Sequence, residues 1–283
     1  MNFQSLVSRI SSVYDAVEAR SIVKILLEDS YRLQFTDICL GALDSLSEAE
    51  TRRLESDMMR LEQGEPVQYV VGSALFCGRR FNVEPGVLIP RPETEELVAW
   101  IKEDAPGIRG SRNGTKYILD IGCGSGCIGT TLALEIEKAD VSAWDVSDTA
   151  LRLTRSNARK LGTNVDIYMQ DALSAPGGDV ELWDVIVSNP PYICAKEAGK
   201  MERNVLDYEP HEALFVPDND PLMFYRSIAE YAIHALRRGG ILYFEINSAY
   251  GKDTVDLLKQ TGFTDVILRK DAFGNDRMVR ARM

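Results

Sequence analysis

A glycine-rich turn lies between an apolar strand and a helical segment near the middle of this chain of 283 residues. The turn reads Asp120-Ile121-Gly122-Cys123-Gly124-Ser125-Gly126. Glycine has no Cβ, so a backbone that is rich in it can approach a ligand closely. A strand, a glycine turn and a helix in this order form the context that a nucleotide-binding turn requires. The NAD spacing Gly-x-Gly-x-x-Gly would need glycine at Cys127, so the turn predicts a Rossmann-like fold that binds a different nucleoside cofactor.

The chain after residue 116 alternates short apolar runs with amphipathic helical segments. We expect strands at 117–121, 141–145, 165–169, 184–188 and 241–245, with helices between them at 127–138, 148–161 and 221–237. A helix near 250–261 then leads to two closing strands at 263–269 and 277–282. This alternation predicts an α/β fold, in which a mostly parallel sheet carries helices on both faces.

The first third of the chain has a different pattern. Residues 1–64 place apolar side chains at helical spacing. Residues 67–71 and 75–81 then predict a β-hairpin that turns near Gly78, and Pro92 followed by acidic residues is typical of a helix N-terminus. We therefore expect a helical substrate-docking domain at 1–64, a β-hairpin linker at 65–92 and the Rossmann-like domain at 93–283.

The charge balance makes nucleic acid an unfavourable partner. Acidic residues outnumber basic ones by 43 to 32, which gives a formal net charge of −11. Proteins that grip duplex DNA usually present a basic face, because neutralising phosphates supplies most of their affinity. We therefore expect no direct contact with nucleic acid.

Cysteine usage and hydropathy favour a cytoplasmic protein. The five cysteines are odd in number and lack paired spacing, which argues against a disulfide framework and fits a reducing compartment. Cys123 and Cys127 are separated by three residues, but no second Cys or His pair follows, so we expect no metal site. We find no apolar run long enough to span a bilayer and no signal peptide in residues 1–10. We expect a monomer without membrane contact.

Two aspartates follow expected strands of the Rossmann-like domain. Asp145 ends the second strand, about twenty residues after the glycine turn, where a carboxylate can accept hydrogen bonds from both ribose hydroxyls. The alternative role, the N-cap of the next helix, is already filled by Ser147. Asp171 follows the third strand and is the matching candidate for an adenine amino group, with an ordinary loop aspartate as the alternative.

The sharpest motif is Asn189-Pro190-Pro191-Tyr192, which closes the fourth expected strand. The lone pair of an amide or aryl NH2 nitrogen is delocalised, so this nitrogen is a poor nucleophile. Two oxygens that accept both of its hydrogens pull the nitrogen towards a tetrahedral, nucleophilic geometry. The Asn189 side chain and the Pro190 carbonyl can supply these oxygens, since prolines stiffen the segment and pre-organise them.

Tyr192 adds a flat face against which a planar amide or base can lie. The alternative, a Pro-Pro turn that only caps the strand, is disfavoured where a Rossmann-like sheet opens its ligand site. The glycine turn and the Asn-Pro-Pro-Tyr segment (residues 189–192) together predict methyl transfer to an amide or an exocyclic amine.

The Gly-x-Gly-x-Gly turn resembles the S-adenosylmethionine loop of Rossmann-like methyltransferases, and the whole chain resembles the release-factor glutamine N5-methyltransferases, also called the HemK family. Two further segments carry the most specific part of this resemblance, and the N-terminal region around 14–19 also matches. The two segments are Ile89-Pro90-Arg91-Pro92-Glu93-Thr94-Glu95-Glu96-Leu97 and Tyr208-Glu209-Pro210-His211-Glu212-Ala213-Leu214.

This resemblance implies transfer of a methyl group from S-adenosyl-L-methionine to the side-chain amide of the glutamine in the Gly-Gly-Gln loop of class 1 peptide chain release factors. It implies that the N-terminal helices dock the release factor, and that Arg91 and Glu93 either brace the site or serve the fold. The implied cofactor-binding residues are Gly122, Cys123, Gly124, Ser125, Gly126, Asp145, Asp171, Ala172 and Asn189. The implied substrate-binding residues are Asn189, Pro190, Pro191 and Tyr192, of which Asn189, Pro190 and Tyr192 are catalytic.

Two positions depart from the family pattern. Ala172 stands where some members carry an aromatic residue, so adenine stacking would be lost there. The turn Glu245-Ile246-Asn247 replaces the Glu-His-Gly of many members, which leaves the role of this turn open.

Two other functions remain as alternatives. An adenine-N6 methyltransferase acting on nucleic acid would use the same kind of NH2 group, but it requires base flipping and a basic groove. The acidic charge balance disfavours it. A non-catalytic protein that only binds the translation machinery is the other alternative, and it predicts that Asn189→Ala leaves activity in cells unchanged.

Overall fold

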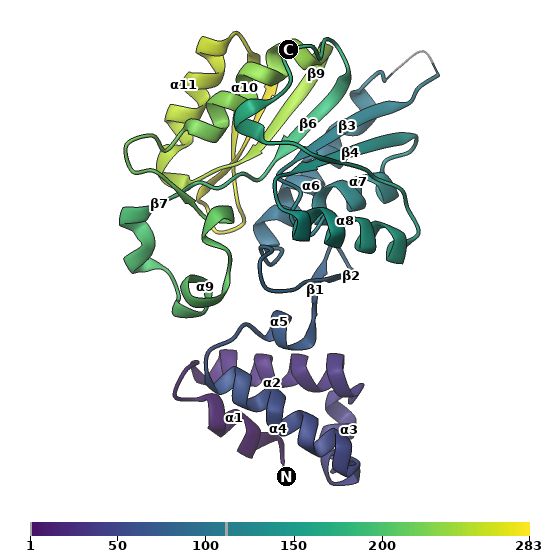
Figure 1. Cartoon of the computed structure of the whole chain (residues 1–283), viewed down its shortest axis with the longest axis vertical. Coiled ribbons are helices and arrows are strands. Elements are labelled where there is room, and N and C mark those ends of the chain that lie inside the picture. Colours follow the sequence, from purple (N-terminus) through teal and green to yellow (C-terminus); the bar gives the residue numbers. More distant parts are fainter. Residues whose placement is uncertain (1, 111–112) are drawn as a thin grey trace. The chain divides into compact units, whose positions relative to one another are not determined.

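The computed structural model describes residues 2–110 and 113–283, and its contacts divide the chain into two compact units. The helical unit comprises Met1–Ser73 together with Met201–Tyr208. The sheet unit comprises Ala74–Lys200 and Glu209–Met283. Figure 1 shows the course of the chain through both units.

The helical unit consists of amphipathic helices around one core. Its elements are α1 (Phe3–Ile10), α2 (Ala16–Tyr31), α3 (Phe35–Cys39), η1 (Ala42–Ser45), α4 (Glu48–Glu62), α5 (Val67–Val71) and α9 (Arg203–Tyr208). Asp15 caps α2, and Ser47 and Glu50 form a capping box at the start of α4. Fully buried side chains such as Leu26 and Leu54 line the helical faces that meet in the core.

Residues 67–71 form helix α5, so the prediction of a strand there was wrong. Val67 and Val70, which lie one turn apart, pack into the helical core, and Gly72 ends the helix with a φ of 72°. The β-branched residues favoured a strand, but burial of this face outweighs that weak preference. The predicted hairpin is confirmed in a shorter form, with β1 (Ser73–Phe76) and β2 (Arg79–Asn82) turning at Gly78.

A segment from the C-terminal half of the chain completes the helical unit. Residues 201–208 include α9 and group with the N-terminal helices. The Tyr208 hydroxyl donates to the Gln63 carbonyl at 3.0 Å. The sequence analysis did not predict this segment as part of the helical unit.

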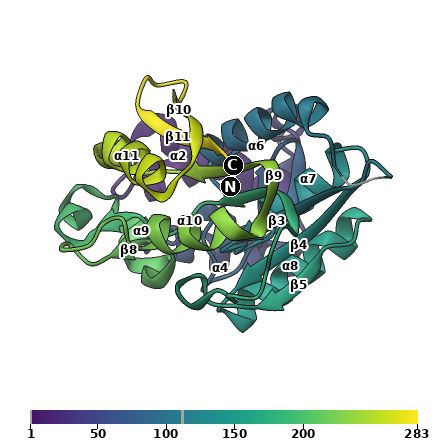
Figure 2. The same ribbon diagram turned by 90° about the horizontal axis from the view of Figure 1, so that it is seen from above.

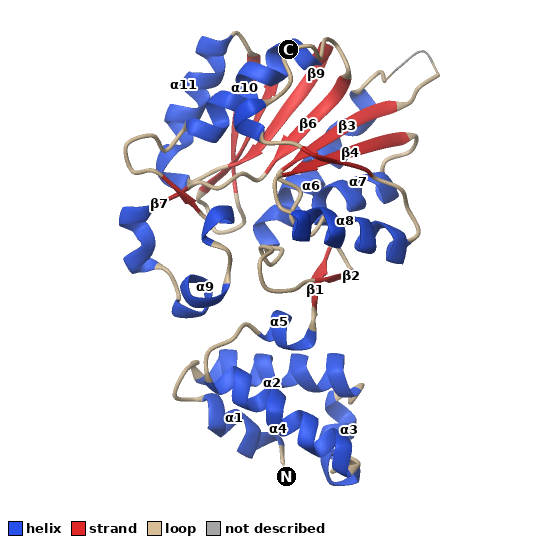
Figure 3. Ribbon diagram, viewed as in Figure 1, coloured by secondary structure: helices blue, strands red, loops and turns tan. Residues whose placement is uncertain are grey.

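The sheet unit contains a seven-stranded sheet. Figure 3 shows helices on both faces of this sheet. Its sheet strands are β3 (Lys116–Ile121), β4 (Ala139–Asp145), β5 (Asp166–Met169), β6 (Trp183–Ser188), β9 (Leu236–Glu245), β10 (Thr264–Lys270) and β11 (Asp276–Arg282). Its longer helices are α6 (Pro92–Asp104), α7 (Cys127–Glu135), α8 (Asp148–Leu161), α10 (Met223–Ala235) and α11 (Gly251–Thr261). Short 3-10 helices are η2 (Ala105–Gly107), η3 (Ala172–Ser174), η4 (Ala195–Lys200), η5 (His211–Ala213) and η6 (Ser248–Tyr250).

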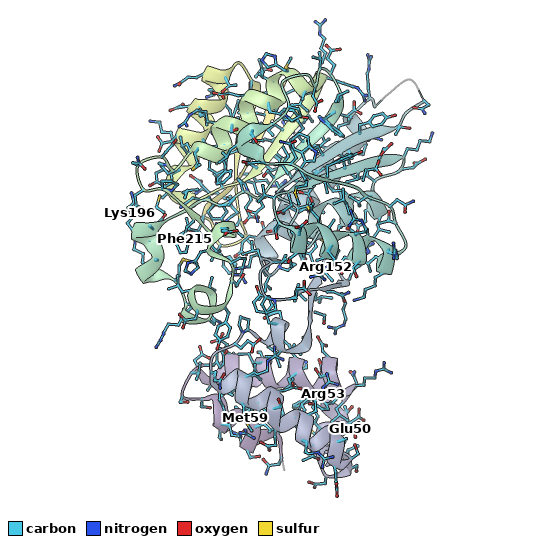
Figure 4. The ribbon with its side chains drawn as sticks, viewed as in Figure 1. Glu50, Arg53, Met59, Arg152, Lys196 and Phe215 are labelled. Atoms are coloured by element: carbon cyan, nitrogen blue, oxygen red, sulfur yellow. The ribbon has the colours of Figure 1, made fainter. Side chains whose placement is uncertain are left out.

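The strands run in the order β10-β11-β9-β6-β3-β4-β5. The strands from β9 to β5 are parallel, and β10 and β11 form an antiparallel hairpin beside β9. A separate parallel pair, β7 (Ile193–Cys194) and β8 (Phe215–Val216), follows the Asn-Pro-Pro-Tyr segment. Figure 4 labels Phe215 of β8 and Lys196, which lies just after β7.

Alternating residues of each central strand face two different cores. Ile118 and Val185 pack with α6 and α7, whereas Leu119 and Ile186 pack with α10 and α11. Figure 2 shows α6 and α10 on opposite sides of the sheet. The α/β prediction and the strands expected from residue 117 onward are therefore confirmed, with small differences at their ends. Every helix in the described ranges is too short or too polar to cross a bilayer.

Candidate active site

The register of the parallel strands brings three predicted segments to one edge of the sheet. Ile121, at the end of β3, lies opposite Trp144 of β4 and Ser188 of β6. The Ser188 hydroxyl donates to the Ile121 carbonyl at 2.7 Å and ties the ends of β3 and β6 together. The glycine turn, Asp145 and residues 189–192 therefore leave the sheet side by side at its carboxyl edge, where α/β proteins bind their ligands.

Helix α8 holds the glycine turn in place. The Thr154 hydroxyl donates to the Gly124 carbonyl at 3.0 Å, and the Asn157 amide donates to the Ser125 carbonyl at 2.9 Å. Gly126 has a φ of 76°, and a Cβ built there would lie 2.6 Å from Cγ2 of Thr154. The tight packing of α8 against the turn thus requires glycine at this position.

The remaining part of the turn is fixed by β4. The backbone amides of Gly122 and Cys123 both donate to the Trp144 carbonyl at 2.9 Å. The Cys123 thiol is buried and lies 3.3 Å from the Thr154 hydroxyl, and burial raises the pKa of the Cys127 thiol to about 12. Both cysteines therefore serve as small packing residues beside the turn.

We expect Gly126→Ala to lower the free energy of unfolding by about 2–3 kcal/mol, from left-handed backbone strain and overpacking against Thr154. Gly162→Ala is the matched control, because Gly162 has a similar φ of 80° but open space around its would-be Cβ. Urea denaturation of the two variants isolates the contact with Thr154. Equal losses in both variants would contradict the requirement for close packing at Gly126.

Asp145 braces the glycine turn as well as facing the ligand edge. Its carboxylate accepts the backbone N–H of Gly124 and that of Ser147, each at 2.9 Å. Burial raises the pKa of this carboxyl group, and the two N–H donors oppose that effect. Ser147 caps α8 by accepting the Ala150 N–H. The N-cap of α8 is therefore Ser147 and not Asp145, which was the alternative role for Asp145.

Asp171 and Ala172 lie beside Asp145 because β5 pairs with β4. The Gln170 N–H donates to the Asp145 carbonyl at 3.1 Å, and Asp171 caps η3 through the Leu173 N–H. The Ala172 carbonyl accepts the Ser227 hydroxyl. Val146, which follows Asp145 directly, is 58% exposed and was not singled out from the sequence. The sequence feature that could have drawn attention to Val146 is its position, since it is a large apolar residue directly after the aspartate that ends a strand.

Residues 189–192 are held by contacts on several sides. The Asn189 side-chain nitrogen donates to the Thr94 hydroxyl at 3.3 Å. Pro190 is buried, and the Tyr192 hydroxyl donates to Oε1 of Glu245 at 3.1 Å. Burial raises the pKa of the Tyr192 phenol, so this hydroxyl keeps its proton at neutral pH. The turn after β9 completes the support, because the Asn247 side-chain nitrogen donates to the Tyr192 carbonyl at 3.0 Å.

The segments 89–97 and 208–214 meet at a buried carboxylate. Glu209 is 4% exposed, accepts the Ile89 N–H at 3.2 Å and pairs with the Arg91 guanidinium. A buried carboxylate is stable only when it is paired and hydrogen-bonded, so this contact joins two segments 118 residues apart. Arg91 thus has a structural partner. Burial is the largest effect that raises the pKa of the Glu245 carboxyl group, and the nearby charge of Glu93 raises it further.

Asp120, the first residue of the glycine motif, lies fully buried beneath the turn. Its Oδ2 accepts the Gly129 N–H at 2.8 Å and caps α7, whose own N-cap residue is Gly126. Among the described residues, Oδ1 of Asp120 has no hydrogen-bond partner. Burial raises the pKa of Asp120 to about 7, an effect that the Gly129 N–H opposes.

Two family models match this chain. Residues 4–72 match the PrmC N-terminal domain, and residues 109–207 match the methyltransferase small domain. A methyltransferase from Pyrococcus furiosus has the same fold at a TM-score of 0.53 and 18% identity, covering 83% of this chain and 98% of that one. A 16S rRNA N2 G1207 methyltransferase of T. thermophilus, solved with AdoMet and guanosine, has a TM-score of 0.53 at 19% identity and covers 74% of this chain and 49% of that one.

Curated relatives extend the similarity over nearly the full chain. A release factor glutamine methyltransferase of Bacteroides thetaiotaomicron is 45% identical over 272 residues, which cover 96% of this chain and 95% of the relative. A release factor glutamine methyltransferase of Flavobacterium psychrophilum is 42% identical over 274 residues, which cover 97% of this chain and 95% of the relative. This identity over both units, together with the matching N-terminal domain, shows that the chain belongs to the release factor glutamine methyltransferase family.

Proposed function

We propose that this protein transfers a methyl group from S-adenosyl-L-methionine to the side-chain nitrogen N5 of the glutamine in the Gly-Gly-Gln motif of class 1 peptide chain release factors. The observation that supports it most is the emergence of the glycine turn and residues 189–192 from the paired strands β3 and β6. The names of the curated relatives support the same substrate class.

The residues at the glycine turn fit a nucleoside cofactor. Gly122 is exposed with a φ of 74°, and a Cβ there would meet no protein atom within 4 Å, so the backbone can approach a ligand. The Asp145 carboxylate can accept ribose hydroxyls, and Asp171 and the exposed Val146 are the proposed contacts of the adenine. When bound, S-adenosylmethionine supplies an electrophilic methyl group at this edge.

The Asn-Pro-Pro-Tyr segment supplies the acceptors for the substrate amide. Oδ1 of Asn189 and the Pro190 carbonyl each accept one hydrogen of the glutamine NH2 group, which raises the nucleophilicity of its nitrogen. The Tyr192 ring lies against the planar amide. The nitrogen becomes acidic once it is methylated and loses its proton without a strong base.

The helical unit is the proposed docking site for the release factor. It exposes large apolar side chains, including Val17, Leu40 and Met59, the last labelled in Figure 4. Exposed apolar residues of this size are candidates for contacts with a protein partner.

Mass spectrometry tests the proposal directly. A release factor incubated with this protein and S-adenosylmethionine is expected to gain one methyl group on the glutamine of its Gly-Gly-Gln loop. Duplex DNA is assayed in parallel for N6-methyladenine. Methylation of the DNA with none on the release factor would instead favour the adenine-N6 alternative.

Deleting residues 1–73 is expected to abolish methylation of the intact release factor while transfer to a short Gly-Gly-Gln peptide persists. The physical reason is that the peptide needs only the acceptors at 189–192, whereas the folded substrate also needs a docking surface. Isothermal titration with S-adenosylmethionine checks that the shortened protein is folded. Normal activity on the intact release factor would exclude a docking role for the helical unit.

A further inference from the structure

We propose that Thr94 and Glu245 are positioning residues that determine which end of the Asn189 side-chain amide faces the substrate. They do so through a directional chain of hydrogen bonds from Asn189 to Thr94 to Glu245. The inference rests on the proposed function in one respect, namely that Asn189 acts as an acceptor for a substrate NH2 group.

The three residues come from distant parts of the sequence but form one continuous contact. Thr94 lies in the first turn of α6, Glu245 ends β9, and Asn189 follows β6. The Asn189 nitrogen lies 3.3 Å from the Thr94 hydroxyl, which lies 2.6 Å from Oε2 of Glu245. Thr94 is 2% exposed and Glu245 is 1% exposed, so water does not compete for these groups.

The direction of the chain follows from the single hydrogen of a threonine hydroxyl. A carboxylate oxygen only accepts, so Thr94 must donate its hydrogen to Glu245. The Thr94 oxygen can then only accept from Asn189, which requires that Asn189 present its NH2 end. Within the described part of the chain, no protein donor reaches Oδ1 of Asn189. The acceptor end of the amide is therefore the end left for a ligand.

A second hydroxyl occupies the other oxygen of the same carboxylate. The Tyr192 hydroxyl donates to Oε1 of Glu245 at 3.1 Å, so Glu245 orders both flanks of the Asn-Pro-Pro-Tyr segment. Burial raises the pKa of the Glu245 carboxyl group, and the Thr94 and Tyr192 hydroxyls and the Arg277 guanidinium oppose this effect by stabilising the carboxylate. Nε of Arg277 also donates to Asp271 at 3.2 Å, which keeps the cation beside this network.

The orientation of Asn189 decides which substrate group can be held. With Oδ1 forward, the site accepts hydrogens from an amide NH2 group. With the amide reversed, its own NH2 group would face the substrate, repel a glutamine NH2 and favour a carboxylate acceptor. The Thr94–Glu245 pair is thus also a specificity device that selects glutamine over glutamate.

Thr94→Val tests the proposal, because valine keeps the shape of threonine and removes the hydroxyl. We expect kcat for methyl transfer to fall by about 10- to 100-fold, since either amide orientation then leaves a polar group unpaired. The dissociation constant of S-adenosylmethionine should stay within about twofold, because among the described residues the Thr94 hydroxyl bonds only to Asn189 and Glu245. Thr94→Ser should recover most of the activity, because it restores the hydroxyl.

Thr131→Val is the matched control. Thr131 is fully buried, and its hydroxyl has no hydrogen-bond partner among the described residues, so the change should leave kcat unaltered. Binding of a release factor with glutamate in place of the loop glutamine gives a second readout. In Thr94→Val, the glutamate form of the release factor should bind more tightly relative to the glutamine form than it does in the wild type. In Thr131→Val, this ratio of affinities should not change.

A third measurement does not depend on the identity of the substrate. The side-chain NH2 resonances of Asn189 in the free protein, assigned by their loss in an Asn189 variant, should exchange with solvent more slowly in the wild type than in Thr94→Val. Equal exchange, or a Thr94→Ser variant as impaired as Thr94→Val, would overturn the positioning role. Absence of methylation by the wild type, with the exchange difference present, would overturn the proposed function alone.

Discussion

Replacing Asn189 with alanine is expected to lower kcat for glutamine methylation by about 10²- to 10³-fold, the usual cost of removing one pre-organised polar group from a reacting centre. The variant removes Oδ1, one of the two acceptors of the substrate NH2 group, and leaves the Pro190 carbonyl alone. The dissociation constant of S-adenosylmethionine should rise only modestly, because the glycine turn is held by α8 and β4 and not by Asn189.

Single-turnover kinetics with a release factor, and isothermal titration with the cofactor, separate these two effects. Asn164→Ala is the matched control, because Asn164 is exposed in the loop before β5, at the opposite end of the parallel strands from Asn189. A loss of cofactor affinity that parallels the loss of kcat would mean that Asn189 serves mainly the cofactor. The amide nitrogen would then need another set of acceptors.

The alternation of strands and helices could be predicted because it follows from local patterning. The apolar runs at 117–121 and 184–188 are buried on both faces, which leaves continuous hydrophobic segments in the sequence. Residues 67–71 show where this reasoning fails. Their β-branched side chains have a local strand preference, but the helical core that buries them is formed by helices far away in the chain.

The candidate site was predicted in its motifs but not in its supporting contacts. The glycine turn and residues 189–192 each combine unusual residues within a few positions, so their chemistry can be read locally. The contact between Thr94 and Glu245 joins residues 151 positions apart, and that between Arg91 and Glu209 joins residues 118 apart. No periodicity or spacing encodes such pairs, because they depend on how the folded elements meet.

A similar limit applies to the turn after β9. The departure from Glu-His-Gly at Glu245-Ile246-Asn247 left its role open, and the folded chain gives each polar residue of the turn a partner. Glu245 accepts two hydroxyl groups, and Asn247 donates to the Tyr192 carbonyl and to Glu197, each at 3.0 Å. The substituted turn therefore still contacts residues 189–192 through side chains that the motif comparison could not evaluate.

Folding stability of the sheet unit is expected to fall as the pH rises from about 4 to about 7, and Asp120 is expected to be a main cause. Burial raises the pKa of its carboxyl group from its ordinary 3.8 to about 7. Between these values the folded protein keeps a proton that the unfolded chain has lost, so raising the pH favours unfolding. Below the window both states are protonated and above it both are ionised, so the contribution of Asp120 is constant there.

The Asp120→Asn variant isolates this contribution, because asparagine has the same shape and does not titrate. The window spans about three pH units, so the stability of the variant relative to the wild type should rise by about 4 kcal/mol between pH 4 and pH 8. Asp145 and Glu245 also have raised pKa values from burial, but they are present in both proteins and cancel in the difference.

Tryptophan fluorescence during urea unfolding measures this difference selectively, because Trp100, Trp144 and Trp183 all lie in the sheet unit. Asp166→Asn removes one carboxylate from an exposed position at the start of β5 and is the control for the loss of charge. A relative stability that stays flat from pH 4 to pH 8 would mean that Asp120 is ionised throughout. Its unpaired Oδ1 would then have to be solvated by a buried water, because an uncompensated charge beneath the glycine turn would otherwise destabilise α7 and the turn together.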